Sequence, residues 1–124
     1  MNTIRLVVIT AIGLGLIASS PRAHAENWTD TGHDLLIDVD SIHKQKDGLV
    51  YYYEKQRSHD MDDNGYPAGS HWGDAEKAAV DCGKRLSYSS YSIEYEKNWR
   101  SKGLPAAPGT MGGVLLDFVC SRSH

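Results

Sequence analysis

One short acidic segment carries several potential metal ligands at close spacing. Asp60, Asp62, Asn64 and Gly65 match the opening of a calcium-binding loop, in which oxygen ligands converge around a turn that glycine permits. The twelfth position of such a loop holds a bidentate glutamate, but here it is His71. Acidic residues next to Asn-Gly are also typical of a hydrated turn. The pattern therefore indicates, at most, a weak calcium site.

Two histidines flank the same segment. His59 and His71, with Asp74 close by, offer imidazole and carboxylate groups that suit zinc or another transition metal. Their spacing matches no zinc motif, and histidines in loops are commonly just hydrated. Residues 59–74 are therefore a candidate loop for a small ligand or a metal ion, and no residue is assigned as a metal ligand.

The seven tyrosines are the second candidate binding feature. Tyrosine is enriched at binding surfaces because it offers a large contact area and a polar tip. In a run of three on one strand, the middle side chain faces opposite to its neighbours, so one face exposes aromatic surface unless both faces are covered. The alternative is that alternate tyrosines pack in the core. The set comprises Tyr51, Tyr52, Tyr53, Tyr66, Tyr88, Tyr91 and Tyr95.

Sequence motifs of common enzyme classes are missing. The chain has no GxSxG nucleophile elbow, no HExxH zinc motif and no phosphate-binding glycine loop. His33, His43 and His124 have no evident partner in the sequence. We therefore expect a protein that is not an enzyme and needs no cofactor.

Residues 1–25 are predicted to be a cleaved signal peptide, followed by a single domain at 26–124. Arg5 precedes an apolar run of 13 residues, Leu6 to Ala18, which is shorter than the roughly 20 that span a membrane. Ala23-His24-Ala25 forms a small-x-small cleavage site, and no nearby cysteine is available for lipid attachment. We expect an exported protein without a lipid anchor or stable membrane insertion, either periplasmic or extracellular.

The charge balance argues against nucleic-acid binding. The chain has a formal net charge of −3, and removal of Arg5 and Arg22 with the signal makes the remaining domain more acidic. An acidic domain repels nucleic acid at long range, and this one lacks a basic stripe. No nucleic-acid partner is therefore expected.

Cys82 and Cys120 are the only cysteines in the chain. In an oxidising compartment two lone cysteines most often pair. A redox or nucleophilic thiol would need a CxxC motif or a positioned histidine, and neither is visible. We predict a structural disulfide worth about 4 kcal/mol in the chain-entropy account.

The apolar pattern predicts an α+β fold with an antiparallel sheet of four to six strands. Strands are predicted at 33–40 and 49–55, with Asp47-Gly48 as a hairpin turn before the second. Residues 76–82 fit either a helix or a strand. Residues 86–95 place alternate apolar side chains on one face, as a strand does.

The chain is predicted to end in a helix that the disulfide ties to the sheet. Thr110 is a plausible N-cap, and the apolar positions 115, 118 and 119 suit one helix face. The polar segment 59–72 and the glycine- and proline-containing segment 98–109 are predicted to be loops.

A series of short motifs follows the predicted signal: Trp28, Asp38-Val39-Asp40-Ser41-Ile42, the aromatic strand after Gly48, Asp81-Cys82, Pro108-Gly109-Thr110 and Val119-Cys120. This order resembles the surface-adhesin protein E-like family of Gram-negative bacteria and covers nearly all of residues 26–124. The resemblance implies an antiparallel sheet packed with a C-terminal helix, bridged cysteines and a strand at 76–82. It also implies a non-enzymatic role, since the family's named member is an adhesin that binds host matrix proteins.

Two functional hypotheses follow. The first is an exported, adhesin-like protein-binding module that contacts host matrix or envelope proteins through a tyrosine-rich sheet surface or the segment 59–72. The alternative is a periplasmic protein that binds a small ligand or calcium through the acidic loop 59–74. Because no lipid-anchor cysteine is present, both the periplasm and the cell surface remain open.

Overall fold

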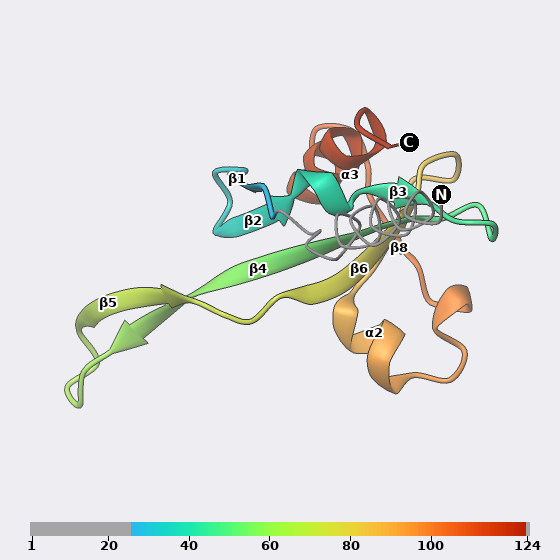
Figure 1. Cartoon of the computed structure of the whole chain (residues 1–124). Coiled ribbons are helices and arrows are strands. Elements are labelled where there is room, and N and C mark those ends of the chain that lie inside the picture. Colours follow the sequence, from blue (N-terminus) through green and yellow to red (C-terminus); the bar gives the residue numbers. More distant parts are fainter. Residues whose placement is uncertain (1–25, 124) are drawn as a thin grey trace, which may run out of the picture.

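The computed structural model describes residues 26–123 and shows a sheet with helices on both faces (Figure 1). Helix α3 (Met111–Cys120) packs on one face, and α2 (Ser90–Tyr95) with the short 3-10 helix η3 (Trp99–Ser101) lies on the other. The predicted α+β class with a C-terminal helix is confirmed. The predicted signal peptide and His124 lie outside the described residues.

Within residues 26–123 the sheet has eight strands, more than the four to six expected, and every pairing there is antiparallel. The path runs β1-β2-β4-β6-β7-β8, and β3 and β5 also pair with β4. Strand β4 is therefore central, with β2 and β3 on one edge and β5 and β6 on the other. The strands are β1 (Trp28–Asp30), β2 (Leu35–Asp38), β3 (His43–Lys44), β4 (Val50–Met61), β5 (Pro67–Trp72), β6 (Glu76–Asp81), β7 (Leu86–Tyr88) and β8 (Leu104–Pro105).

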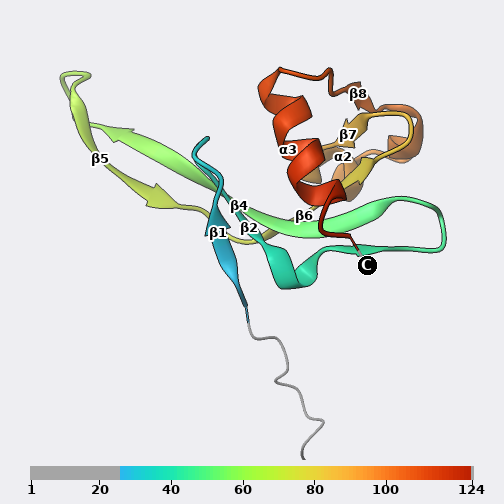
Figure 2. The ribbon, with the colours of Figure 1, turned by 90° about the horizontal axis from the view of Figure 1, so that it is seen from above.

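The segment predicted as a polar loop at 59–72 is instead part of a hairpin arm. Strand β4 continues to Met61 and pairs with β5, and the hairpin projects away from the helices in both views (Figures 1 and 2). Gly65 closes the turn with a φ of +86°, a conformation that glycine adopts without strain. The loop prediction was wrong because both faces of the arm are largely hydrated, so backbone pairing forms these strands without an apolar face.

Residues 86–95 are not one strand, as predicted, but a short strand and a helix. Strand β7 ends at Tyr88, and the hydroxyl of Ser89 accepts a hydrogen bond from the Ser92 N–H at 3.1 Å, which begins α2. The Tyr91 and Tyr95 rings, four residues apart, then lie against each other at a tilt of 46°, with 5.1 Å between centroids. The alternating pattern was misleading because the serine cap decides the local conformation.

One core lies between α3 and the sheet. Leu116 and Val119 of α3 are buried against Ile37, Val50 and Val80. The predicted N-cap is confirmed, since the Thr110 hydroxyl accepts a hydrogen bond from the Gly113 N–H at 3.1 Å. Positions 113, 116 and 119 of the helix are buried. Of the predicted apolar face, position 119 is therefore buried, while 115 and 118 are only half-buried.

A second core lies on the opposite face. Trp99 of η3, within the predicted loop 98–109, packs edge-on against Tyr51 and Tyr88, with ring centroids 6.4 and 5.4 Å apart. Ala79 and Leu49 complete this cluster. Both faces of β4 are thus covered, which explains why the adjacent Tyr51 and Tyr52 are both buried.

The disulfide predicted between Cys82 and Cys120 is present, with the Cα atoms 6.0 Å apart. Cys82 directly follows β6, and Cys120 is the last residue of α3. The strand that the family resemblance implied at 76–82 is present as β6. The bridge therefore joins the C-terminal end of the helix to the central part of the sheet.

Glu54 is a buried carboxylate in the middle of this framework. It is 8 % exposed, and burial raises its pKa above the ordinary value near 4.5. The nearby charge of Glu76, its partner across the β4–β6 pair, raises it further. Hydrogen bonds from Gln56 and Tyr52 oppose this shift without cancelling it. Folding therefore favours the protonated form of Glu54.

The substitution Glu54→Gln is expected to stabilise the protein more at pH 8 than at pH 4. The folded state binds the Glu54 proton more tightly than the unfolded state, so wild-type stability falls as pH rises from about 4.5 through the raised pKa. Glutamine does not ionise, so the Glu54→Gln variant does not lose this stability as the pH rises. Urea unfolding of both proteins at the two pH values measures the difference, and an equal gain at both values would contradict the prediction.

Candidate functional site

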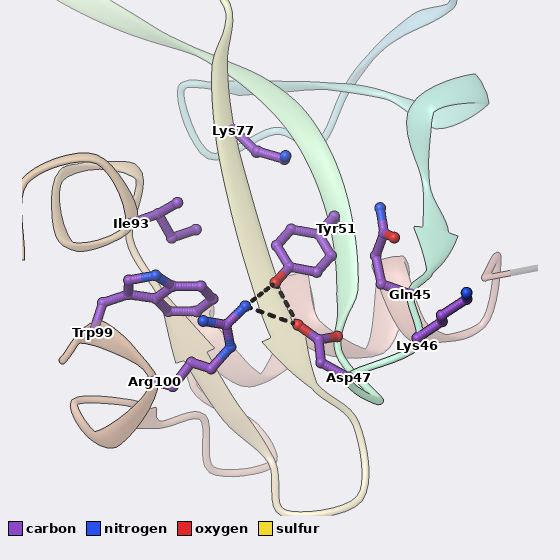
Figure 3. A pocket seen from close by; sticks show the side chains of 8 residues that line it. All are labelled: Gln45, Lys46, Asp47, Tyr51, Lys77, Ile93, Trp99 and Arg100. Carbon is purple, nitrogen blue, oxygen red and sulfur yellow. Dashed lines mark hydrogen bonds and ion pairs between the residues drawn. The ribbon is translucent and has the colours of Figure 1, made fainter. Parts of the chain in front are cut away.

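A cleft of about 490 Å³ lies where the turn between β3 and β4 meets η3 (Figure 3). Its walls come from five elements: the turn, the facing positions of β4 and β6, helix α2 and η3. The lining residues are Gln45, Lys46, Asp47, Tyr51, Lys77, Ile93, Trp99 and Arg100.

The predicted Asp47-Gly48 turn positions one wall of the cleft. The Gly48 N–H donates to the Gln45 carbonyl at 3.0 Å, and Gly48 has a φ of +88°. The Asp47 carboxylate accepts a hydrogen bond from the Leu49 N–H at 3.0 Å, which holds the side chain beside the start of β4. The second carboxylate oxygen is thereby directed toward Tyr51.

Asp47, Tyr51 and Arg100 form a hydrogen-bonded group at the edge of the cleft (Figure 3). The Tyr51 hydroxyl donates to Asp47 Oδ2 at 2.6 Å, and an Arg100 guanidinium nitrogen lies 3.3 Å from the same oxygen. Arg100 also donates to the Tyr51 hydroxyl oxygen at 3.4 Å. The group joins η3 to the β3–β4 turn and fixes the guanidinium over the cleft.

The protonation states of this group follow from its contacts. Burial raises the pKa of Tyr51, and the neighbouring Asp47 carboxylate raises it further. Burial alone would raise the pKa of Asp47, but hydrogen bonds from Tyr51, Leu49 and Arg100 outweigh it and the net pKa is lowered. At neutral pH Asp47 is therefore ionised and Tyr51 is a neutral donor.

The cleft is positively charged although the whole chain is acidic. Its lining carries three cations, Lys46, Lys77 and Arg100, and one carboxylate, that of Asp47. Lys77 Nζ lies 5.1 Å from the centroid of the Tyr51 ring, and Arg100 Cζ lies 4.3 Å from that of Trp99. Neither of the two lysines forms an ion pair within residues 26–123. Their charges are therefore available to a ligand.

This arrangement suits the binding of a carboxylate. Arg100 has a side chain that is 61 % exposed and uses only part of its donor set on Asp47 and Tyr51. A guanidinium recognises a carboxylate through paired N–H donors, and a lysine adds a mobile point charge. The rings of Tyr51 and Trp99 form the floor of the cleft between these charges.

The acidic segment does not bring its candidate ligands together. His71 pairs with Asp60 at 3.2 Å across the arm, and His59 pairs with Asp34 at 2.8 Å. Asp62 Oδ1 accepts the N–H groups of residues 64 and 66, as in an ordinary turn. In the part of the chain that the structure describes, no group of three or more His, Cys, Asp or Glu side chains could hold a metal ion. Calcium binding at Asp60, Asp62 and Asn64 stays a prediction.

The tyrosines do not form one surface. Tyr51, Tyr52 and Tyr88 are buried, and of the seven only Tyr51 lines the cleft. The exposed members are spread over β4, the tip of the arm and α2, namely Tyr53, Tyr66, Tyr91 and Tyr95.

Three residues central to the cleft carried no recognisable signal in the sequence. Trp99 and Arg100 lie in a segment that reads as a loop, and Lys77 lies on a strand that also fits a helix. Only the adjacency of Trp99 and Arg100 could have pointed to this place, and that adjacency matches no known binding motif.

Comparisons with protein-family models, with curated proteins and with solved structures found no match to this chain. No helix within residues 26–123 is long and apolar enough to cross a membrane.

Proposed function

We propose that this chain is an exported, non-enzymatic protein-binding module and that the cleft between the β3–β4 turn and η3 contacts an acidic segment of its partner. The observation that carries the proposal is the group of three cations around Tyr51 and Trp99 on an otherwise acidic chain. The motif order that resembles adhesins and the missing catalytic motifs also support it. Host matrix and envelope proteins are the partner classes to test.

A protein segment suits this cleft better than an extended polyanion does. The net negative charge of the chain repels a long chain of like charge, whereas one or two carboxylates experience mainly the local positive field. Trp, Tyr and Arg are also the residue types that contribute most to protein–protein binding. All three are present here in hydrogen-bonded or stacked contact.

The test compares two charge-matched double variants. Protein purified from cells that express the full chain is immobilised, and partners are captured from host matrix and envelope extracts. Fluorescence anisotropy then measures the binding of labelled acidic peptides from those partners. The Lys46→Gln/Lys77→Gln variant removes two cleft charges while leaving the group of Asp47, Tyr51 and Arg100 intact. We expect it to weaken binding about tenfold, or about 1.4 kcal/mol.

The matched control is Lys55→Gln/Lys84→Gln, which makes the same change in net charge outside the cleft. We expect this variant to bind within about twofold of wild type. If both double variants weaken peptide binding equally, only the net charge of the protein matters, and the assignment to the cleft is overturned. Heparin fragments that bind more tightly than the acidic peptides would also overturn the assignment to a protein segment.

A further inference from the structure

A second cavity, of about 160 Å³, lies on the other side of the sheet beneath α3. Its walls are formed by strands β4, β6, β7 and β8, by the N-cap of α2 and by residues 112–116 of α3, and they mix apolar side chains with hydroxyl groups. The lining residues are Tyr52, Glu54, Ala78, Val80, Ser87, Tyr88, Ser89, Leu104, Gly112, Leu115 and Leu116.

Glu54 is the one carboxylate in this lining, and its charge has no counterion among the described residues. Its Oε2 accepts a hydrogen bond from Gln56 Nε2 at 3.2 Å. None of the lysine, arginine or histidine side chains in residues 26–123 forms an ion pair with it. Glu76 across the strand pair adds a second negative charge.

The other buried carboxylate of the described chain provides a contrast. Asp38 is also 8 % exposed, but its Oδ1 accepts the N–H groups of Asn27 and Asp40 at 3.0 and 3.1 Å. Asp38 thereby begins the 3-10 helix η2 (Val39–Ser41), so its burial has a structural reason. Glu54 caps no helix. Because burial without a counterion raises its pKa, ionising Glu54 lowers the stability of the folded protein as the pH rises, which points to a role outside folding.

The size and lining of the cavity define the ligand that would satisfy Glu54. A cavity of roughly 150 Å³ is large enough for a molecule the size of benzene. The apolar walls from Ala78, Val80 and Leu116 suit such a body, while Glu54 accepts hydrogen bonds and favours a positive charge. A primary ammonium group carries the donors and the charge that this position lacks.

We propose that the cavity beneath α3 binds a small primary amine, with its ammonium group on Glu54 and its apolar body between β6 and α3. This site is separate from the positively charged cleft, which lies on the opposite face, and the proposal goes beyond the protein-binding function. The ligand is a free amine rather than a lysine side chain, because Glu54 lies beneath the helix with only 8 % of its surface exposed.

Benzylamine is the probe for this site, and benzyl alcohol is its neutral match. Titration at neutral pH, followed by amide chemical shifts of the purified protein, should show benzylamine shifting the cavity-lining residues. Benzyl alcohol should bind at least about tenfold more weakly. Glu54→Gln should weaken benzylamine about tenfold or more, whereas Glu76→Gln, which removes an exposed charge outside the lining, should change it less than about threefold.

A second variant tests the cavity without changing the carboxyl group of Glu54. Ala78→Leu fills the space beside Glu54 and should abolish benzylamine binding in a protein that still unfolds cooperatively in urea. Retained binding in this variant would overturn the proposal. So would equal weakening by the two glutamate variants, equal affinity for benzyl alcohol, or no shifts up to about 10 mM benzylamine. A lysine-containing peptide that binds as tightly as benzylamine would overturn the assignment to a free amine.

Discussion

Replacing Cys82 and Cys120 together with alanine is expected to lower the free energy of unfolding by about 4 kcal/mol. The bridge joins positions 38 residues apart, so its loss gives the unfolded chain considerably more freedom. Loss of the bridge also releases the C-terminal end of α3 from β6, next to the buried Val119. Urea unfolding in oxidising buffer, followed by far-UV circular dichroism, measures the change.

The reduced wild-type protein is the control for this substitution. Because the chain has only two cysteines, a reductant should lower the stability of wild type to about that of the double variant and leave the variant unchanged. Two thiols that react with an alkylating agent before reduction would contradict the prediction. A variant with wild-type stability would show that α3 packing alone holds this end of the helix.

The features that were predictable from sequence depend on local chemistry. Two cysteines allow one pairing, and Thr110 followed by an apolar run carries its own helix signal. The Asp47-Gly48 turn is likewise encoded by two adjacent residues. In each case the residues that determine the structure are neighbours in the chain or have a single possible partner.

The hairpin arm could not be read from the sequence, for a physical reason. The alternation of apolar and polar residues identifies a strand because one face is usually buried. From Ser58 to His71 almost every side chain is exposed, so that alternation is missing. These strands form because the backbone of β4 continues past β2 and β6 and offers its hydrogen bonds to β5.

The cleft was missed because its parts are far apart in the chain. Asp47 and Arg100 are 53 residues apart, and Lys77 reaches Tyr51 only through the pairing of β6 with β4. The acidic segment attracted the prediction because a calcium loop is a local motif. Its side chains instead pair across the arm or hold its turn.

The substitution Trp99→Ala is expected to cost about 3 to 5 kcal/mol of stability and to abolish binding of acidic peptides. Trp99 is 9 % exposed, and its ring packs against Tyr51 and Tyr88 in the core beneath α2 and η3. It also carries the guanidinium of Arg100 on its face, so its loss releases that group from the cleft. Urea unfolding by far-UV circular dichroism and peptide anisotropy measure the two effects.

Trp72→Ala is the matched control, because this tryptophan lies on the arm and stacks with Arg57 at 4.4 Å instead of filling a core. It should cost at most about 1 kcal/mol and leave peptide binding unchanged. Trp99→Phe, which keeps an aromatic edge for Tyr88, separates the two roles of Trp99. Phenylalanine fills most of the core but offers Arg100 a smaller face. We therefore expect Trp99→Phe to restore more of the stability than of the peptide binding that Trp99→Ala loses. Full recovery of binding with Trp99→Phe would show that the cleft needs only a filled core, and not the tryptophan face that now supports Arg100.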